Sequence, residues 1–224
     1  MANSKIIIAI DSYEYDQASH ILEQLNPSLC MIKIGSITFN SLGKEFIYLA
    51  HGKGFEIFLD LKLHDIPNTV QKSIEGLITL PIKMLTIHTS GGIKMMQAAM
   101  QAVKDIEIKI FGVTVLTSLS DEDTNYIFRR EAQDQVKAML DLAEEARIDG
   151  IVCSPHELHL VTPRSSLLSI TPGIRFTSSD DDQRRIMTPK QAIELGADFI
   201  VIGRPITESN NISKSLNDLS EQIK

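Results

Sequence analysis

The sequence predicts a single (β/α)8 barrel, and two observations lead to that fold class. Short runs rich in β-branched residues recur eight times along the chain, and segments with helical periodicity lie between them. Eight units in 224 residues leave about 28 residues each, which is the length of a strand, a helix and two short loops. We therefore expect one TIM-barrel domain over residues 1–224.

The expected strands and helices alternate over the whole length. The strands are expected at residues 6–11, 29–35, 55–62, 84–88, 108–116, 150–154, 168–174 and 199–204. The helices are expected at residues 15–25, 37–53, 69–80, 93–104, 130–146 and 189–195. Because no Gly/Ser or Pro linker divides the chain and no G-x-G-x-x-G follows the first strand, a doubly wound open sheet fits less well.

The net charge of the chain argues against a nucleic-acid-binding surface. The net charge is −7 and the isoelectric point is near 5.4. The longest basic clusters are the pairs Arg129-Arg130 and Arg184-Arg185. An anionic small ligand must then be held by a few individually placed cations.

The apolar runs and the cysteines indicate a cytoplasmic protein. The first apolar run is short and ends at Asp11, and no run approaches the roughly 18 residues of a membrane span. Cys30 and Cys153 lie in separate apolar strands, where each is expected to be a small core residue in a reducing compartment. We expect no membrane association.

The third expected strand contains an ion pair. It belongs to the stretch F-E-I-F-L-D-L-K-L-H-D-I-P-N-T-V, in which a period of two puts Asp60 and Lys62 on one face and apolar residues on the other. An ordinary pair on a solvated face is the alternative, but the neighbouring strands look buried on both faces. Ion pairs inside apolar strands are costly, so we expect a functional reason for this one.

Charged residues collect at one end of the expected barrel. Barrel enzymes build their sites at the carboxyl ends of the strands. The first strand ends in Asp11 and the second offers Lys33, which join Asp60 and Lys62 from the third. Alternating charges of this kind keep each lysine charged and fixed, and a fixed ammonium can donate a proton to a transient carbanion.

The last two strand ends indicate a phosphate site. T-P-G-I-R contains Arg175, and V-I-G-R-P-I contains Gly203 and Arg204. Glycine lets the backbone approach an anion, and a guanidinium supplies a bidentate contact. A surface arginine closing the last strand is the alternative. Residues 176–183 are polar, and composition allows either a solvated loop or a lid in which Gln183 reaches the phosphate and the ring.

The histidines do not indicate a metal site. His156 and His159 have i, i+3 spacing, but no third ligand lies near them in the sequence, so zinc is not expected. His88 ends the fourth strand, where we expect an inward histidine satisfied by a neighbouring hydrogen bond.

The ten-residue string D-L-K-L-H-D-I-P-N-T closely resembles orotidine 5′-phosphate decarboxylases. The resemblance extends over essentially the whole chain, through I-A-I-D, K-I-G, H-T-S-G-G, V-T-V-L-T-S, T-P-G-I-R and I-G-R. It implies conversion of orotidine 5′-monophosphate to uridine 5′-monophosphate and CO₂, the last step of de novo pyrimidine nucleotide synthesis. No metal and no cofactor are implied.

The resemblance also implies roles for the charged residues. Lys62 would protonate C6 of the pyrimidine, and Asp60 would face the departing CO₂. Asp11 and Lys33 would hold the ribose hydroxyls. Asp65 would complete the catalytic group from a neighbouring subunit.

Partner and phosphate contacts follow from the same resemblance. Thr69, like Asp65, would reach into the neighbouring subunit's site, which implies a homodimer. Thr117 would lie beside the pyrimidine, with Ser120 as a further contact. The residues matching the phosphate and lid positions are Pro172, Arg175, Gln183, Gly203 and Arg204.

Two other functions are compatible with this fold. The D-x-K-x-x-D core also resembles magnesium-dependent sugar-phosphate enzymes such as hexulose-6-phosphate synthase and ketogulonate-6-phosphate decarboxylase. Those have an acidic residue where this chain has Lys33, and a cation there would repel the metal. A non-catalytic phosphate-binding barrel is the other alternative, although every position of the charged group is filled.

Overall fold

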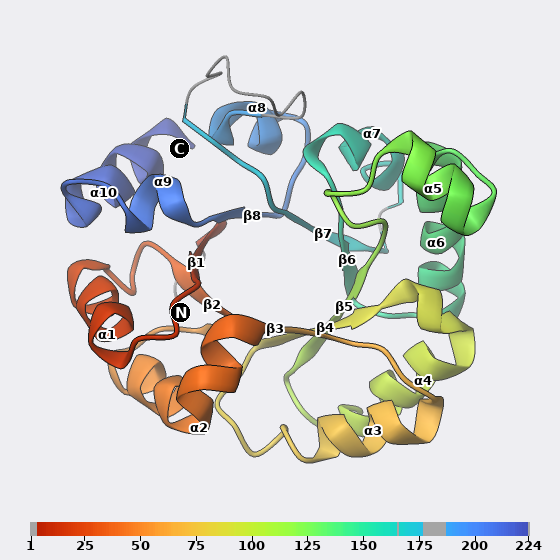
Figure 1. Cartoon of the computed structure of the whole chain (residues 1–224), viewed down its shortest axis with the longest axis horizontal. Coiled ribbons are helices and arrows are strands. Elements are labelled where there is room, and N and C mark those ends of the chain that lie inside the picture. The colour runs from red at the N-terminus through yellow and green to blue at the C-terminus, as the bar shows by residue number, and fades with distance from the viewer. Residues whose placement is uncertain (1–3, 165, 177–186, 224) are drawn as a thin grey trace.

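In the described part of the chain, eight parallel strands close into one barrel, and the predicted (β/α)8 fold is confirmed. The computed structural model describes residues 4–164, 166–176 and 187–223. Strands pair in chain order, β8 pairs with β1, and the helices form a ring outside them (Figure 1). The strands are β1 (Ile6–Ile10), β2 (Met31–Gly35), β3 (Ile57–Leu63), β4 (Met84–His88), β5 (Lys109–Val113), β6 (Gly150–Val152), β7 (Leu168–Thr171) and β8 (Phe199–Ile202).

Most helices lie where periodicity predicts them. The α-helices are α1 (Tyr15–Gln24), α2 (Ser36–Gly52), α3 (Pro67–Glu75), α4 (Gly92–Ala102), α5 (Asp121–Phe128), α6 (Ala132–Ala146), α7 (Leu158–Val161), α8 (Pro189–Glu194), α9 (Arg204–Thr207) and α10 (Ile212–Gln222). Two 3₁₀ turns, η1 (Thr89–Gly91) and η2 (Pro155–Glu157), follow β4 and β6.

The helices expected from the sequence do not include α5, α9 or α10, and the helix expected at residues 69–80 starts and ends later than α3 does. Helix α3 starts at Pro67, whose fixed φ suits a first helical position, and ends at Glu75 rather than at residue 80. Helices α5 and α10 begin at side-chain caps: Ser120 accepts from the Asp123 amide, and Asn211 accepts from the Lys214 amide.

Two separate apolar layers follow from the alternation of side chains along the strands. The smaller cluster contains Ile7, Ala9, Met31, Phe58, Met84, Phe111, Ile170 and Val201, one or two residues from almost every strand, and fills the barrel. The larger cluster contains the intervening residues, such as Ile8 and Leu59, packed with the helices. The interior cluster stops at Phe58, so the next inward position, Asp60, lies at the carboxyl end of the barrel.

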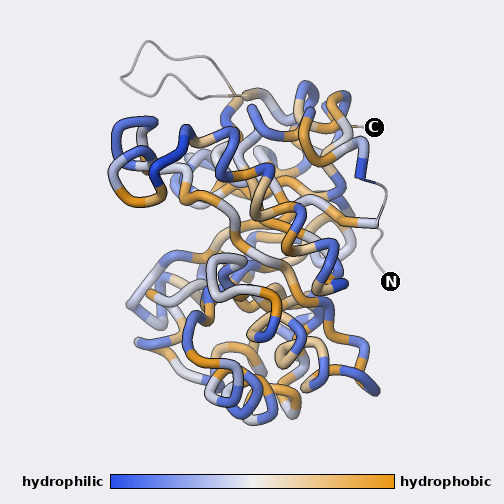
Figure 2. The backbone as a smooth tube through the Cα atoms, turned by 90° about the vertical axis from the view of Figure 1, so that its right-hand side faces the viewer, coloured by the Kyte–Doolittle hydropathy of each residue, from blue (hydrophilic) through white to orange (hydrophobic). Residues whose placement is uncertain are grey.

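Hydrophobic and hydrophilic residues alternate in short stretches along the tube (Figure 2). No helix among the described residues has the length and apolar content that crossing a membrane requires.

Candidate active site

Four charged side chains from the first three strands form one chain of ion pairs. Lys62 Nζ lies 2.8 Å from Asp60 Oδ2, and Lys33 Nζ lies 3.4 Å from the same oxygen. Lys33 Nζ also lies 3.3 Å from Asp11 Oδ1. Acid and base alternate from β1 to β3, and we call these four residues the charge network. Asp60 and Lys33 are its most buried members, with side chains 10% and 12% exposed.

The carboxyl group of Asp60 stays ionised despite its burial. Burial alone would raise the pKa of Asp60, because a charged group is poorly solvated inside the protein. The ammonium groups of Lys33 and Lys62 and hydrogen bonds from Lys62 and Thr86 outweigh that effect and hold the pKa below its ordinary value. Asp60 therefore presents a fixed negative charge to whatever lies at the mouth of the barrel.

Thr86 on β4 contacts both Asp60 and Lys62, and the charge pattern of the sequence does not reveal it. Its hydroxyl donates to Asp60 Oδ1 at 2.9 Å and accepts from the Lys62 amide at 2.9 Å. The sequence gives only a weak indication of this role, since Thr86 is a single uncharged polar residue inside the mostly apolar strand M-L-T-I-H.

His88 at the end of β4 lies near the charge network, with Lys62 and Asp60 among the charged groups that affect it. Its ring centroid is 5.2 Å from that of His64, which follows β3. Burial lowers the pKa of His88, the neighbouring His64 and Lys62 lower it further, and Asp60 opposes them. The imidazole of His88 is therefore neutral near pH 7, which avoids adding a third cation beside Asp60.

A cavity of about 670 Å³ connects the charge network to the last two strands. Asp11 and Lys33 line one side of it. The loops after β7 and β8, residues 172–175 and 203–204, line the other side, and we call them the Gly/Arg loops. Their lining residues are Pro172, Gly173, Ile174, Arg175, Gly203 and Arg204. The structure thus brings together residues that stand up to 193 positions apart, since Asp11 and Arg204 face one space.

Asp60 and Lys62 do not line this cavity, and neither do four other expected site residues. Asp65, Thr69 and Thr117 are exposed on the surface of the chain. Ser120 is engaged in capping α5, where its hydroxyl donates to the Asp123 carboxylate at 2.7 Å. Gln183, with the expected lid, lies outside the described residues.

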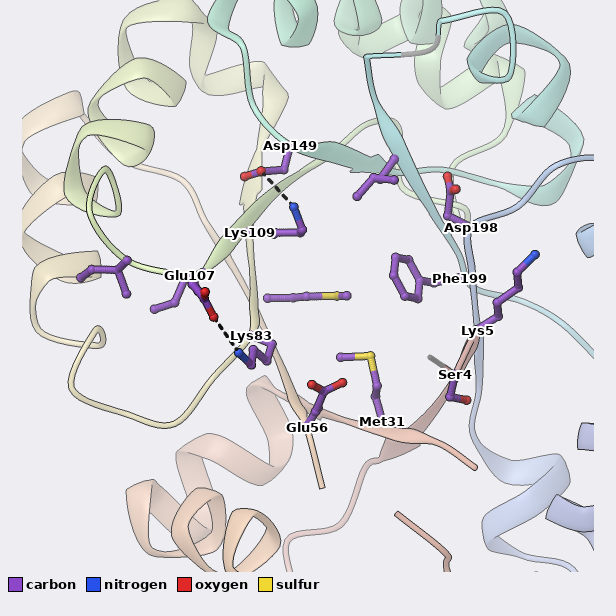
Figure 3. A pocket seen from close by; sticks show the side chains of 14 residues that line it. Ser4, Lys5, Met31, Glu56, Lys83, Glu107, Lys109, Asp149, Asp198 and Phe199 are labelled. Atoms are coloured by element: carbon purple, nitrogen blue, oxygen red, sulfur yellow. Dashed lines mark hydrogen bonds and ion pairs between the residues drawn. The ribbon is translucent and has the colours of Figure 1, made fainter. Parts of the chain in front are cut away.

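A second cavity, of about 690 Å³, opens at the opposite end of the barrel (Figure 3). Met31 and Phe199 point toward it from the amino ends of their strands, and Met84 also lines it. Its charged rim is largely paired, with Lys83 Nζ 3.4 Å from Glu107 and Lys109 Nζ 3.6 Å from Asp149. Barrel sites lie at carboxyl ends, so the cavity beside the charge network is the candidate active site.

His156 and His159 contact each other after β6. The ring nitrogen Nδ1 of His159 donates to the carbonyl oxygen of His156 at 2.9 Å. Across residues 4–164, 166–176 and 187–223, no three His, Cys, Asp or Glu side chains are grouped as metal ligands.

The fold and the site define a (β/α)8-barrel enzyme with its charged groups at the carboxyl ends of the strands. Residues 4–219 match the model of the "Orotidine 5′-phosphate decarboxylase / HUMPS family", and the chain belongs to this family. The orotidine 5′-phosphate decarboxylase of Saccharophagus degradans is 40% identical, over 98% of this chain and 94% of that protein. The one from Haemophilus ducreyi is 42% identical, over 96% and 98%.

Two solved structures of orotidine 5′-phosphate decarboxylases are similar to this chain. The crystal structure of orotidine 5′-phosphate decarboxylase from Lactobacillus acidophilus matches with a TM-score of 0.86 at 31% identity and covers 98% of both chains. A decarboxylase from Methanocaldococcus jannaschii, solved with the inhibitor BMP, matches with a TM-score of 0.81 over 99% of both chains. At 22% identity the second match supports the fold alone.

Proposed function

We propose that this chain decarboxylates orotidine 5′-monophosphate to uridine 5′-monophosphate, the last step of pyrimidine nucleotide biosynthesis. The observation that carries the proposal is the Lys62 ammonium held 2.8 Å from Asp60, in a network that adjoins a cavity ending at the Gly/Arg loops. Membership of the decarboxylase family supports the same reaction.

The nucleotide fits the site with its phosphate at the Gly/Arg loops. Arg175 and Arg204 supply guanidinium groups there, and Gly203 lets the backbone approach the anion. Gln183 completes the phosphate contact in this proposal, and Pro172 shapes the wall of the cavity. Asp11 and Lys33 hold the ribose hydroxyls on the opposite side.

The reaction replaces the carboxylate on C6 by a proton. The bond from C6 to the carboxylate carbon breaks, CO₂ leaves, and the electron pair stays on C6. Lys62 then transfers a proton from its ammonium group to C6 and becomes a neutral amine until water reprotonates it. Asp60 faces the substrate carboxylate, so two like charges oppose each other in the bound substrate and separate when CO₂ departs.

Fixed charges are what this reaction requires. The pyrimidine ring delocalises charge at C6 poorly, so the barrier falls mainly through preorganised cations near the developing carbanion. Lys33 and Lys62 are held by Asp60 before substrate binds and need no reorganisation. Binding energy from the distant phosphate helps to seat the ring against these groups.

We further infer a homodimer in which the loop after β3 enters the partner's site. Asp65 and Thr69 are exposed in this chain, and Ile66 between them is 66% exposed. An exposed isoleucine flanked by site residues fits a surface that a second copy covers. Thr117 is exposed after β5, and we place it beside the pyrimidine of the bound nucleotide in this proposal.

The cytoplasm is the compartment we propose for this enzyme. Cys30 and Cys153 are buried free thiols, and burial raises the pKa of each. Such thiols suit a reducing compartment.

The test of the reaction is an absorbance assay with purified protein and orotidine 5′-monophosphate, run with and without a metal chelator. We expect loss of pyrimidine absorbance at the same rate in both. Unchanged absorbance despite nucleotide binding would indicate a binding module. Activity abolished by the chelator would indicate the magnesium-dependent chemistry of the sugar-phosphate enzymes.

The role of Lys62 is tested by Lys62→Ala. General acid catalysis contributes about 10²–10⁴-fold, so we expect kcat to fall by at least about 10²-fold while uridine 5′-monophosphate still binds. Lys53→Ala is the control, because Lys53 forms a surface ion pair with Glu23 at 3.6 Å, away from the site. A Lys62→Ala enzyme that keeps most of its turnover would remove Lys62 from the acid role.

A further inference from the structure

The ladder between β3 and β4 breaks where the catalytic pair lies. Leu59 pairs with Leu85, but the next register pair is Leu63 with Ile87. The chain advances four residues on β3 and only two on β4, so the segment from Asp60 to Lys62 bulges opposite Thr86. Bulges re-aim side chains beside active sites, and this one lies between the two residues proposed for the chemistry.

Lys62 has a backbone conformation that needs support. Its φ is +52°, in the left-handed region that side chains with a Cβ rarely adopt. Its amide donates to the hydroxyl of Thr86 at 2.9 Å in place of a regular ladder bond. The hydroxyl of Thr86 therefore accepts the hydrogen bond that a β4 backbone carbonyl would accept from Lys62 in a regular ladder.

The same hydroxyl fixes the orientation of the Asp60 carboxylate. It donates to Oδ1 at 2.9 Å, while both ammonium groups lie on the other oxygen, Oδ2. A hydroxyl has one proton to donate and lone pairs to accept, so both contacts form at once. Thr86 is completely buried, so no solvent competes for its contact with Asp60.

We propose that Thr86 is a positioning residue of the decarboxylase: its single hydroxyl locks the Asp60 carboxylate and the Lys62 backbone into one arrangement. The proposal rests on the proposed roles of Lys62 and Asp60. Thr86 is fully buried and its hydroxyl contacts Asp60 and Lys62, so it acts on the reaction through these two residues.

The electrostatic consequence concerns Asp60. The charged or titratable groups that face it are Lys33 on β2, Lys62 on β3 and His88 on β4. The Thr86 hydrogen bond is one of the contacts that lower the pKa of Asp60. Without this bond the pKa of Asp60 rises, so the acid limb of the kcat/KM profile moves to higher pH.

The test compares Thr86→Val with Thr86→Ser. Valine keeps the shape and loses the hydroxyl, whereas serine keeps the hydroxyl. Losing a hydrogen bond to a charged group changes a rate constant by about 10- to 100-fold. We therefore expect kcat of Thr86→Val to fall by that factor. KM should change by less than about threefold, since Thr86 touches no ligand. Thr86→Ser should restore both kcat and the wild-type acid limb.

Thr89→Val is the matched control. Thr89 is equally buried, and its hydroxyl donates to the Val113 carbonyl oxygen at 2.8 Å, so it also loses a buried hydrogen bond. Its variant should lose stability while its kcat and acid limb stay at wild-type values. If Thr86→Val fails to fold, Thr86→Ala gives the same comparison with a smaller side chain.

Three outcomes would overturn the proposal. These are wild-type kcat and pH profile in Thr86→Val, failure of serine to restore activity, and a shift of the acid limb in Thr89→Val as large as in Thr86→Val. The Lys62→Ala variant separates failure of the positioning role of Thr86 from failure of the proposed function. An inactive Lys62→Ala with an unaffected Thr86→Val refutes only the positioning role, whereas an active Lys62→Ala refutes the proposed function itself.

Discussion

At the residue scale, Asp60 shows how a buried carboxylate becomes a fixed charge. It has two ammonium groups on one oxygen and a threonine hydroxyl on the other. Both carboxylate oxygens have a donor or a cation beside them, and these contacts outweigh the desolvation that would otherwise neutralise the group. The result is a site whose charges are set before substrate arrives.

The charge of Asp60 should also make stability depend on pH. Its folded-state pKa lies below the ordinary value of 3.8, so ionised Asp60 stabilises the folded chain above that pH. This stabilisation is lost as the pH falls through the lower folded-state pKa. Asp60→Asn should therefore lower the free energy of unfolding by about 1–3 kcal/mol at neutral pH. The deficit should shrink below about pH 4.

Chemical denaturation at several pH values measures this dependence. Asp218→Asn is the control, because Asp218 forms an exposed i, i+4 pair with Lys214 that contributes little at any pH. A deficit for Asp60→Asn that grows as the pH falls would contradict the assignment of a lowered pKa.

At the scale of elements, the loops after β7 and β8 hold the other half of the site. Gly173 has a φ of +81°, which glycine adopts without strain, and it turns the chain so that Arg175 reaches the cavity. Arg204 starts α9 directly after Gly203, opposite Asp11. The two loops belong to adjacent strands, so their guanidinium groups face one space.

Arg204→Ala should therefore weaken phosphate binding. A charge-assisted contact with a phosphate corresponds to about 10- to 100-fold, so KM for orotidine 5′-monophosphate should rise by that factor with little change in the free energy of unfolding. Steady-state kinetics with the nucleotide and with orotidine, which has no phosphate, measures the difference. Orotidine should be turned over equally well by variant and wild type.

The exposed Arg130 provides the control for lost charge. Arg130→Ala removes one cation from an exposed position after α5 and should leave KM unchanged. An Arg204→Ala enzyme with wild-type KM would place the phosphate elsewhere in the cavity.

At the scale of the whole molecule, one rim of the barrel carries exposed apolar side chains. Tyr13, Ile37 and Ile66 follow β1, β2 and β3, and each is more than half exposed. Tyr13 and Ile66 lie in loops, and Ile37 lies in the first turn of α2, so all three follow the carboxyl ends of neighbouring strands. We propose that a second subunit docks on this rim.

Ile66→Asp should separate the subunits. A carboxylate placed in an apolar interface is costly to bury, so the variant should sediment as a monomer at concentrations where the wild type is a dimer. Its activity should fall together with its mass, because Asp65 and Thr69 would no longer reach a second site. Analytical ultracentrifugation with parallel activity measurements tests this expectation.

Leu195→Asp is the control for surface charge. Leu195, just after α8, is 49% exposed and lies in another part of the barrel. Its variant should keep the mass and activity of the wild type. Unchanged sedimentation of Ile66→Asp would exclude the loop after β3 from the interface.

The sequence by itself determined the fold and the end of the barrel at which the charges gather. Eight β-branched runs with helical segments between them leave few other folds, and strict alternation puts Asp60 on the inward face above Phe58. Both features are local, since they depend on neighbours within one element. Helix α5 escapes this reasoning, because it begins at a single capping residue and buries only Thr124, whereas α10 does carry a short apolar stripe of Ile212, Leu216 and Leu219.

Only the tertiary structure decided which residues touch. The cavity between β1 and β8, the bulge at Lys62 and the contact of Thr86 with Asp60 depend on how separate strands register against each other. Asp60 and Thr86 stand 26 positions apart, and no periodicity within one strand fixes such a pairing. Periodicity assigns each side chain to a face, whereas register and closure of the barrel assign its partners.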